Sequence, residues 1–351
     1  MGTVAEALRA LRSCKTFVGF YASGDRYRYE YWTRDLSFSL KTLLGLGYHR
    51  QVKRQLSAIW AKQRKTGEVP TLFVNNRLVW LLKKTFRAVK MHRVPFMLEH
   101  YLGLEFFFNE WTVDSTPHAL ISTYEYASHT MDKSLIEKFG PNIKLALGYI
   151  KNRSTNGLLV GSDWRDTMIH QKDKVLLSNQ CLLYRMYELL RKTREADYIK
   201  RRINTDFWDG DHYIDRLDSK NIDSLGLSLG VIFNIIPKDR YASVAKLLKA
   251  CESRYGVRNM LIRDKNMDPD RLRIPTCDQY SVVWPFISCY AAMALNKMGY
   301  KRLAIAEMNK MSELNGFNEW YSPDSGKPLG SKNQLWTAAL YLESVKDVGQ
   351  I

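Results

Sequence analysis

Apolar residues recur along most of the chain three and four positions apart, which is the spacing of amphipathic helices. Ser, Asp, Asn, Gly and Pro residues beside these segments supply start and stop signals. The helices that this pattern predicts cover residues 3–12, 35–46, 50–63, 76–90, 117–130, 133–151, 178–193, 224–235, 240–254, 279–298, 301–314 and 332–345. Convincing strand-like alternation is rare, so the pattern predicts an all-α protein. No linker rich in Pro, Gly or Ser divides it, which predicts a single domain over residues 1–351.

Acidic residues stand in the breaks between the predicted helices at a recurring interval. They are separated by 79, 52, 57, 55 and 41 positions, and they are Asp35, Asp114, Asp166, Asp223, Asp278 and Glu319. A helical hairpin with its turns takes about 50 to 60 residues, so these loops would emerge at the same end of an array of hairpins. A closed ring of six hairpins would gather them around one opening. An open solenoid would spread them along a surface, as in a non-catalytic scaffold; the lack of a repeat consensus favours the ring.

Composition adds a pointer to ligand binding. Hydrophobic residues make up 45% of the chain, and nine Trp and twenty Tyr are more rings than a core needs. Such rings also stack on flat apolar faces of ligands. The formal net charge of +17 would suit nucleic acid, an acidic membrane surface or an anionic substrate. The basic residues are dispersed among acids, however, and the densest segment, 83–93, reads as a solvated helix face, so nucleic acid is not the expected partner.

Several classes of protein are disfavoured by what the sequence lacks. The five cysteines are scattered without a CxxC spacing, which predicts reduced thiols and a cytoplasmic location. The first residues read as an amphipathic helix rather than a signal peptide, and no apolar run approaches the eighteen residues of a spanning helix. The seven histidines show no metal-ligand spacing and no phosphate-binding glycine loop is present, so neither a metal nor another cofactor is expected.

One carboxylate has an unusual local setting. Glu319 lies between aromatic residues in the Gly- and Pro-bounded segment 316–327. An apolar, ring-walled site raises the pKa of a carboxyl group, and general acid or base catalysis on a glycoside uses such a group. The alternative is a surface turn with residues 324–326 at its tip.

Six segments resemble motifs of glucoamylase-like enzymes, glycogen-debranching glucosidases and neutral invertases, in the same order along the chain. They are residues 29–35 (W-x-R-D), 113–117 (V-D-[AS]), 162–168 (the W-x-D acid loop), 178–184 (the helix after it), 278–285 (a variant of G-x-x-W-P) and 319–337 (the terminal base loop and final helix). The resemblance covers nearly the whole chain. It implies an (α/α)6 toroid, the ring of hairpins that the loop spacing favours.

The resemblance also implies inverting glycoside hydrolysis, in which one carboxylic acid protonates the leaving oxygen and an opposite carboxylate activates water. By position, Asp166 is the general acid and Glu319 the general base. Asp163 is a rival acid, because in trehalase-like relatives the acid directly follows a Gly-Leu or Gly-Trp pair. Ser162 and Asp163 could instead cap a helix.

Further residues are carried over as substrate ligands. Arg34 and Asp35 would bind sugar hydroxyls, with a buried ion pair as the alternative. The candidate stacking platforms are Trp32, Trp164, Trp284 and Trp320, of which at least one is expected to be core; the candidate hydrogen-bond donors are Arg165, Asn179, Gln180 and Gln279. Asp114 is expected to cap the helix that begins near Pro117.

The expected activity is that of an inverting exo-glycosidase, an α-glucosidase acting on small oligosaccharides. Residues 77–111 are longer and more basic than the resemblance leads us to expect, which predicts a lid or a homo-oligomer interface there. With the positive charge, this keeps an anionic glycoside open as substrate. Three further functions stay open: a neutral invertase, a sugar epimerase or unsaturated-glucuronyl hydrolase, and a helical scaffold or sugar-binding protein without catalysis.

Overall fold

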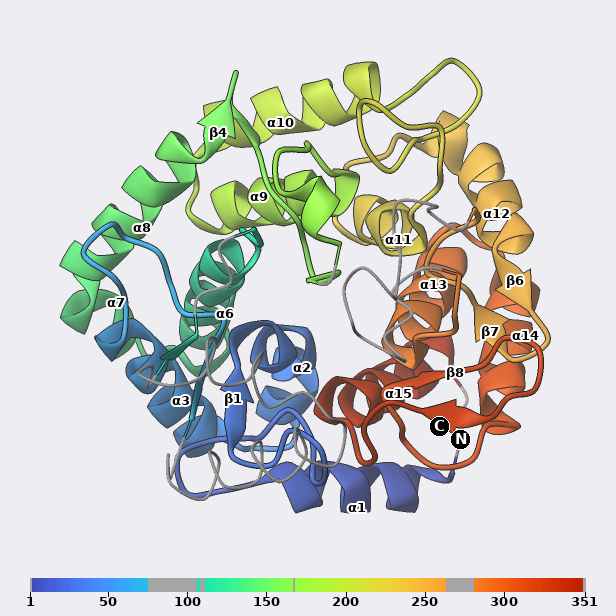
Figure 1. Cartoon of the computed structure of the whole chain (residues 1–351), viewed down its shortest axis with the longest axis horizontal. Helices are drawn as coiled ribbons and strands as arrows, with labels where there is room; N and C mark the ends of the chain where they lie inside the picture. Colours follow the sequence, from blue (N-terminus) through green and yellow to red (C-terminus); the bar gives the residue numbers. More distant parts are fainter. Residues whose placement is uncertain (1, 75–105, 108–110, 167, 263–280, 350–351) are drawn as a thin grey trace, which may run out of the picture.

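The computed structural model describes residues 2–74, 106–107, 111–166, 168–262 and 281–349. Figure 1 shows helices arranged in two concentric rings, with the N- and C-terminal ends of the chain beside each other. The inner ring consists of α2 (Thr33–Gly45), α6 (Ser115–Thr130), α9 (Leu177–Leu189), α11 (Ser224–Ile232), α13 (Pro285–Lys297) and α15 (Leu335–Val348). Each inner helix packs against the next, and α15 packs against α2. The ring is therefore closed, and the predicted all-α class and (α/α)6 toroid are confirmed.

The outer ring supplies a partner for each inner helix. It consists of α1 (Val4–Cys14), α3 (His49–Ala61), α7 (Ser134–Lys138), α8 (Gly140–Asn152), α10 (Thr193–Asp206), α12 (Tyr241–Ala250) and α14 (Lys301–Ser312). The first helix of the chain, α1, pairs with the last inner helix, α15. Outer helices bury one stripe each, as in α10 with Ala196, Ile199 and Ile203, whereas all residues of α11 from Ser224 to Val231 are buried. None of the described helices is long and apolar enough to cross a membrane.

Short strands lie in the loops between the rings. A three-stranded antiparallel sheet joins β1 (Glu30–Trp32), β2 (Leu72–Val74) and β3 (Phe106–Phe107), and pairs Trp32 with Leu72. Three hairpins follow: β4 (Ser154–Thr155) with β5 (Leu158–Leu159), β6 (Glu252–Ser253) with β7 (Gly256–Val257), and β8 (Trp320–Tyr321) with β9 (Pro328–Leu329). Each hairpin leads from an outer helix toward the next inner one. Two 3-10 turns, η1 (Ile169–Gln171) and η2 (Lys238–Arg240), complete the described elements.

The structure corrects several predicted helices. The single helix expected over 133–151 is broken between α7 and α8, where Pro141 stands in the first turn of the second helix. The outer helix α10 was missed, because charged residues dominate its sequence. The helix expected from residue 332 begins at Leu335, and α13 begins at Pro285. The helix expected at 76–90 lies outside the described residues, as does nearly all of the predicted lid or interface at 77–111.

The axis of the toroid is hollow at the end away from the connecting hairpins. A cavity of about 320 Å³ there is lined by later turns of all six inner helices. Three ion pairs between described residues lie in its wall: Lys41 with Glu343, N to O 2.7 Å apart, and Arg185 with Glu125 at 3.0 Å and with Glu188 at 2.6 Å. Because later turns of all six inner helices line this cavity, the inner helices point the same way. Their N-terminal ends therefore meet at the opposite end of the axis.

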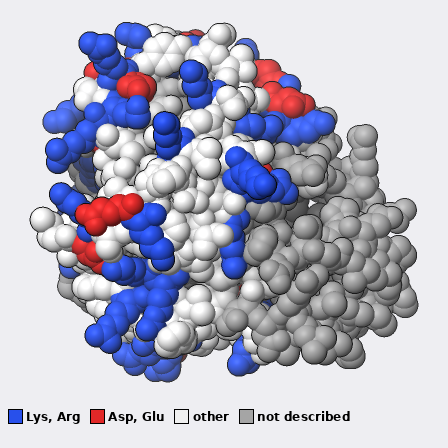
Figure 2. All heavy atoms as spheres, turned by 90° about the vertical axis from the view of Figure 1, so that its left-hand side faces the viewer, with Lys and Arg blue, Asp and Glu red and all other residues white. Residues whose placement is uncertain are grey.

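Positive charge is prominent on one outer face of the molecule (Figure 2). Figure 2 shows a face, on the side of α7 and α8 in Figure 1, where Lys and Arg outnumber Asp and Glu. Lys138, Lys144 and Lys151 of these two helices are exposed. Acidic side chains are interspersed, and Lys53 of α3 pairs with Asp132 at 2.7 Å.

Candidate active site

The predicted acidic loop residues converge at the N-terminal ends of the inner helices. Asp35 lies in the first turn of α2, Asp114 directly precedes α6, and Asp166 lies in the loop that leads to α9. Asp223 is the N-cap of α11, and Glu319 lies on the loop before β8. Asp278 and Gln279 lie outside the described residues.

Glu319 is buried but hydrogen-bonded on both oxygens. The Tyr27 hydroxyl donates to Oε1 at 2.8 Å, the Ser331 amide donates to Oε2 at 2.8 Å, and Arg26 Nη1 lies 3.8 Å from Oε2. Burial raises the pKa of Glu319, while these three groups oppose the rise because they favour the ionised form. The result is a desolvated carboxylate with a raised pKa, which is a stronger base than an exposed one.

Residues 22–27, before β1, form this environment through hydrogen bonds to residues 319–335, and we call this contact the clasp. The Leu335 amide donates to the Ala22 carbonyl at 2.9 Å, and the Ser331 hydroxyl bonds that of Ser23 at 2.6 Å. Gly330 has a φ of +67°, and a Cβ there would lie 2.5 Å from Glu319 Oε2. Only glycine therefore fits so close to the carboxylate.

Asp166 lies beside a buried arginine and remains partly open to solvent. Arg34 Nη1 is 3.6 Å from Asp166 Oδ2, and the Asp166 side chain is 21% exposed. Arg34 is 1% exposed, donates to the Trp164 carbonyl at 2.7 Å and lies 3.3 Å through Nε from Asp114 Oδ2. The ion pair that was the alternative for Arg34 thus exists, and one of its partners is the candidate acid.

Asp35 is the second member of the motif on α2. It is 3% exposed and accepts a hydrogen bond from Gln334 Nε2 at 3.0 Å. Burial raises the pKa of Asp35 well above its usual range, more than Arg34 lowers it, and the charges of Glu319 and Asp166 add to the rise. Asp35, Asp166 and Glu319 are therefore close enough to interact electrostatically.

Asp163, the rival acid, has a different environment. It is 1% exposed, Arg165 donates to both of its oxygens at 2.8 and 2.9 Å, and the Ser178 hydroxyl also donates to it. Burial would raise the pKa of Asp163, but the Arg165 charge and these hydrogen bonds lower it below the usual value. Asp163 is thus held ionised, and it caps no helix. Arg165 is fully occupied within the core between Asp163 and Asp223, which lies 3.8 Å away.

Two predicted hydrogen-bond donors are placed in the protein interior instead of at the site. Asn179 Nδ2 donates to the Gly161 carbonyl at 2.9 Å, and Gln180 bonds both the amide and the carbonyl of Leu159 at 2.9 Å. Both side chains are fully buried. Because their amides are used by the backbone of the loop before Asp163, they hold that loop in place.

The four candidate stacking tryptophans also divide into residues buried in the core and one that is partly exposed. Trp164 and Trp284 are each 2% exposed and meet edge to face at 5.0 Å, and Trp284 stacks on Trp320 at 6.4 Å. These three rings form a packed aromatic cluster. Trp32 is half-buried, donates through Nε1 to Glu30 at 2.9 Å and contacts the ring of Tyr27. Among the four, Trp32 is therefore the ring best placed to meet a ligand.

Asp114 is not the helix cap that its position suggested. It stands at the N-cap position of α6, but its side chain makes no capping hydrogen bond because its backbone is helical there. Instead it faces Arg34.

The sequence did not predict three residues that contact Glu319: Tyr27, Arg26 and Ser331. The Tyr- and Arg-rich stretch before the W-x-R-D motif was the one available signal for the first two.

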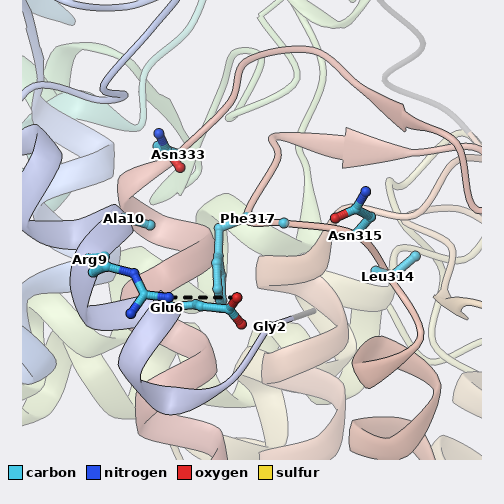
Figure 3. Close-up of a pocket in the computed structure, with 9 residues that line it drawn as sticks. Gly2, Glu6, Arg9, Ala10, Leu314, Asn315, Phe317 and Asn333 are labelled. Carbon is cyan, nitrogen blue, oxygen red and sulfur yellow. Dashed lines mark ion pairs between the residues drawn. The ribbon is translucent and has the colours of Figure 1, made fainter.

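A second pocket lies on the outer side of the ring. It has a volume of about 390 Å³ and lies between α1 and the loop at 314–317. Figure 3 shows Phe317 among its lining residues and the ion pair between Glu6 and Arg9, whose N and O atoms are 3.6 Å apart. None of the candidate catalytic or substrate-binding residues lines it. Among the described residues, no group of His, Cys, Asp and Glu side chains has the arrangement of a metal site.

Comparisons with known proteins agree with the fold. Residues 186–337 match the family described as mannosylglycerate hydrolase MGH1-like glycoside hydrolase domain. A GH63 mannosylglycerate hydrolase from Thermus thermophilus in complex with glucose superposes with a TM-score of 0.70 at 12% identity, covering 97% of this chain and 100% of that one. The same enzyme with Tris and D-glycerate gives 0.69 at 13% identity over 96% and 98%. A structure titled "Glycosidase Wild Type" gives 0.67 at 14% identity over 99% and 96%.

No curated protein matches the sequence at a significant level. The solved structures share the toroid at low identity, and the family match adds a glycoside hydrolase domain over the second half of the chain. The chain is therefore similar, in its fold and over residues 186–337 in its sequence, to glycoside hydrolases built on this toroid.

Proposed function

We propose that the protein is an inverting exo-glycosidase in which Asp166 is the general acid and Glu319 the general base. The observation that carries this proposal is the contrast between two carboxyl groups at one end of the toroid. Glu319 is desolvated and hydrogen-bonded as an anion, whereas Asp166 is partly exposed beside Arg34. An inverting enzyme needs one ionised and one protonated carboxyl group, separated by about 6.5–9.5 Å to admit a water. The hydrogen bonds on Glu319 suit the ionised base, which leaves the role of the acid to Asp166.

The environment of Asp163 supports Asp166 as the acid. A carboxylate that accepts hydrogen bonds from Arg165 and Ser178 in the core cannot readily hold or release a proton. Arg34 and Asp35 lie next to Asp166 and Glu319, and we assign them to the sugar hydroxyls, with Trp32 as the stacking ring.

Small α-glucosides are the first candidate substrates. An anionic glycoside, such as a hexose linked to glycerate, is the second; the family match and the position of Arg26 favour it. Arg26 is partly exposed and lies beside Glu319, where it could also meet a carboxylate of the substrate. The oligomeric role of residues 77–111 and the cytoplasmic location stay predictions.

The test is an NMR time course with a panel of disaccharides and glycosyl-glycerates. Wild-type protein should release a sugar of inverted anomeric configuration. Asp166→Asn and Glu319→Gln should each lower kcat by about a thousandfold or more while circular dichroism stays unchanged, since each removes a group that moves a proton in the transition state. Glu343→Gln, in the wall of the axial cavity at the far end, is the matched control and should retain activity. Retained hydrolysis in either site variant, or a product of retained configuration, would rule out the assignment.

A further inference from the structure

One buried guanidinium serves two carboxyl groups at the candidate site. Arg34 Nε lies 3.3 Å from Asp114 Oδ2, and Arg34 Nη1 lies 3.6 Å from Asp166 Oδ2. Arg34 and Asp114 are at most 1% exposed, so solvent screens their interaction little. Arg34 also interacts electrostatically with Asp35 and Asp163, so its single positive charge is shared among four carboxyl groups, of which Asp114 and Asp166 lie at ion-pair distance.

Asp114 is paired with Arg34 but, within the described part of the chain, is not fixed by hydrogen bonds. It is fully buried, makes no capping bond to α6, and neither of its oxygens accepts a hydrogen bond from the residues that the structure describes. A buried ion pair without hydrogen bonds contributes little to stability, because the desolvation of both charges offsets their attraction. The negative charge of Asp114 can instead act on the neighbouring Arg34 and Asp166.

The charged and titratable groups around Asp114 can be named. They are Arg34, the carboxyl groups of Asp163 and Asp166, and His118, whose Nε2 lies 3.9 Å from Asp114 Oδ2. Burial lowers the pKa of His118 to about 3, so this ring is neutral and does not offset the charge of Asp114. Burial also raises the pKa of Asp114 to about 6, above which it is ionised.

An ionised Asp114 favours the protonated form of Asp166 in two ways. It offsets part of the Arg34 charge, which otherwise favours the ionised form of Asp166, and it repels a negative charge on Asp166 directly. Both effects favour the protonated carboxyl group. An unshared opposite charge at this range lowers the pKa of a carboxyl group by about 1 to 3 units, so an Arg34 without Asp114 would tend to deprotonate the general acid.

We propose that Asp114 is a positioning residue which, through Arg34, keeps Asp166 protonated and thus competent as the general acid near neutral pH. This inference rests on the proposed function in one respect only, the role of Asp166. The electrostatic coupling of the two carboxyl groups holds whatever the substrate.

The test is the pH dependence of kcat/KM for Asp114→Asn. The alkaline limb, which reports the general acid, should move about 1 unit or more to lower pH, while the acidic limb, to which Glu319 contributes, should stay in place. Asp223→Asn is the matched control: it removes another buried carboxylate with a pKa of about 6, one paired with Arg165, and should leave the alkaline limb unmoved. An unmoved limb in Asp114→Asn, with or without lower activity, would overturn the proposal.

A readout that needs no turnover separates this inference from the proposed function. The carboxyl ¹³C resonance of Asp166, identified by its loss in Asp166→Asn, should titrate at lower pH in Asp114→Asn than in wild type. If it does so in a protein that hydrolyses no glycoside, the proposed function fails and the coupling stands. If glycosides are hydrolysed and the titration is unchanged, the coupling fails. Asp114→Ser, a smaller neutral replacement that leaves room for water beside Arg34, gives the same comparison if Asp114→Asn does not fold.

Discussion

At the scale of single residues, the site depends on how a few carboxyl groups are solvated. Glu319 and Asp163 are both buried, yet they differ in their partners: Glu319 has a tyrosine, a backbone amide and a partly exposed arginine, whereas Asp163 has a fully buried arginine. The pKa of Glu319 is raised and that of Asp163 is lowered. Residue type alone does not distinguish them; the donors around each oxygen do.

Tyr27→Phe tests the environment of Glu319. The variant removes the 2.8 Å hydrogen bond to Oε1, which favours the ionised base, so the pKa of Glu319 should rise further. A hydrogen bond to a charged group contributes about 1.5 kcal/mol or more, equivalent to about 1 pH unit. The acidic limb of kcat/KM should therefore move up by about 1 unit. Tyr21→Phe, a nearby change without contact to Glu319, should leave the limb in place; equal profiles for both variants would contradict the assignment.

Motifs located some site residues and could not locate others. Arg34, Asp35 and Glu319 sit in short patterns whose chemistry can be read from neighbours in sequence. Tyr27 could not be found this way, because its bond to Glu319 spans 292 positions. Asn179 was misassigned for a related reason: an amide next to a loop can face a ligand or the loop backbone, and only packing decides which.

At the scale of elements, hydrophobic periodicity predicted the inner helices well. They bury most of their residues, and the starts of α6, α11 and α13 are marked by Ser, Thr or Pro. Outer helices were harder, since α10 buries only Ala196, Ile199 and Ile203 in fourteen residues. The break between α7 and α8 was missed because apolar residues continue through it in a helical register.

The outer helix α1 offers a test at this scale. It starts with a capping box in which the Thr3 hydroxyl accepts from the Glu6 amide and the Glu6 carboxylate accepts from the Thr3 amide, and it packs on α15. Thr3→Ala should lower the free energy of unfolding by about 1 kcal/mol in urea denaturation. Ser13→Ala, which removes a bond to the Ala10 carbonyl within the same helix and leaves the capping box intact, should have a smaller effect. The reverse order would show that the capping box does not stabilise α1.

At the scale of the whole molecule, the buried charges are out of balance. Carboxyl groups are buried at the end of the toroid where the inner helices begin; they belong to Asp35, Asp114, Asp163, Asp223 and Glu319. Among the described residues, the fully buried arginines there are Arg34 and Arg165. Burial raises the pKa of Asp114 and of Asp223 to about 6 each. In the folded protein these two carboxyl groups therefore bind protons near pH 6. In the unfolded chain they do so only near pH 3.8, their ordinary pKa.

This imbalance predicts an acid optimum of stability. A carboxyl group with a raised folded pKa makes folding more favourable as pH falls from above about 6 toward 4, by up to roughly 2 to 3 kcal/mol for each such group. The pKa of Asp163 is lowered, so its contribution is present above the unfolded value and is lost at still lower pH. The melting temperature should therefore be several degrees higher near pH 5 than near pH 7.5, and then fall below pH 4. Asp114→Asn combined with Asp223→Asn should flatten the rise; a steady fall from pH 7.5 to 5 in wild type would contradict it.

The clasp between residues 22–27 and 319–335 has a consequence for how the protein becomes active. Its hydrogen bonds join segments about three hundred positions apart, and contacts of such separation form late because the loop-closure entropy must first be overcome. Glu319 meets Tyr27 only when the ring has closed, so partly folded chains with most helices in place would still lack the base. Recovery of glycoside turnover during refolding would then report the final closure, lagging behind the return of helical circular dichroism.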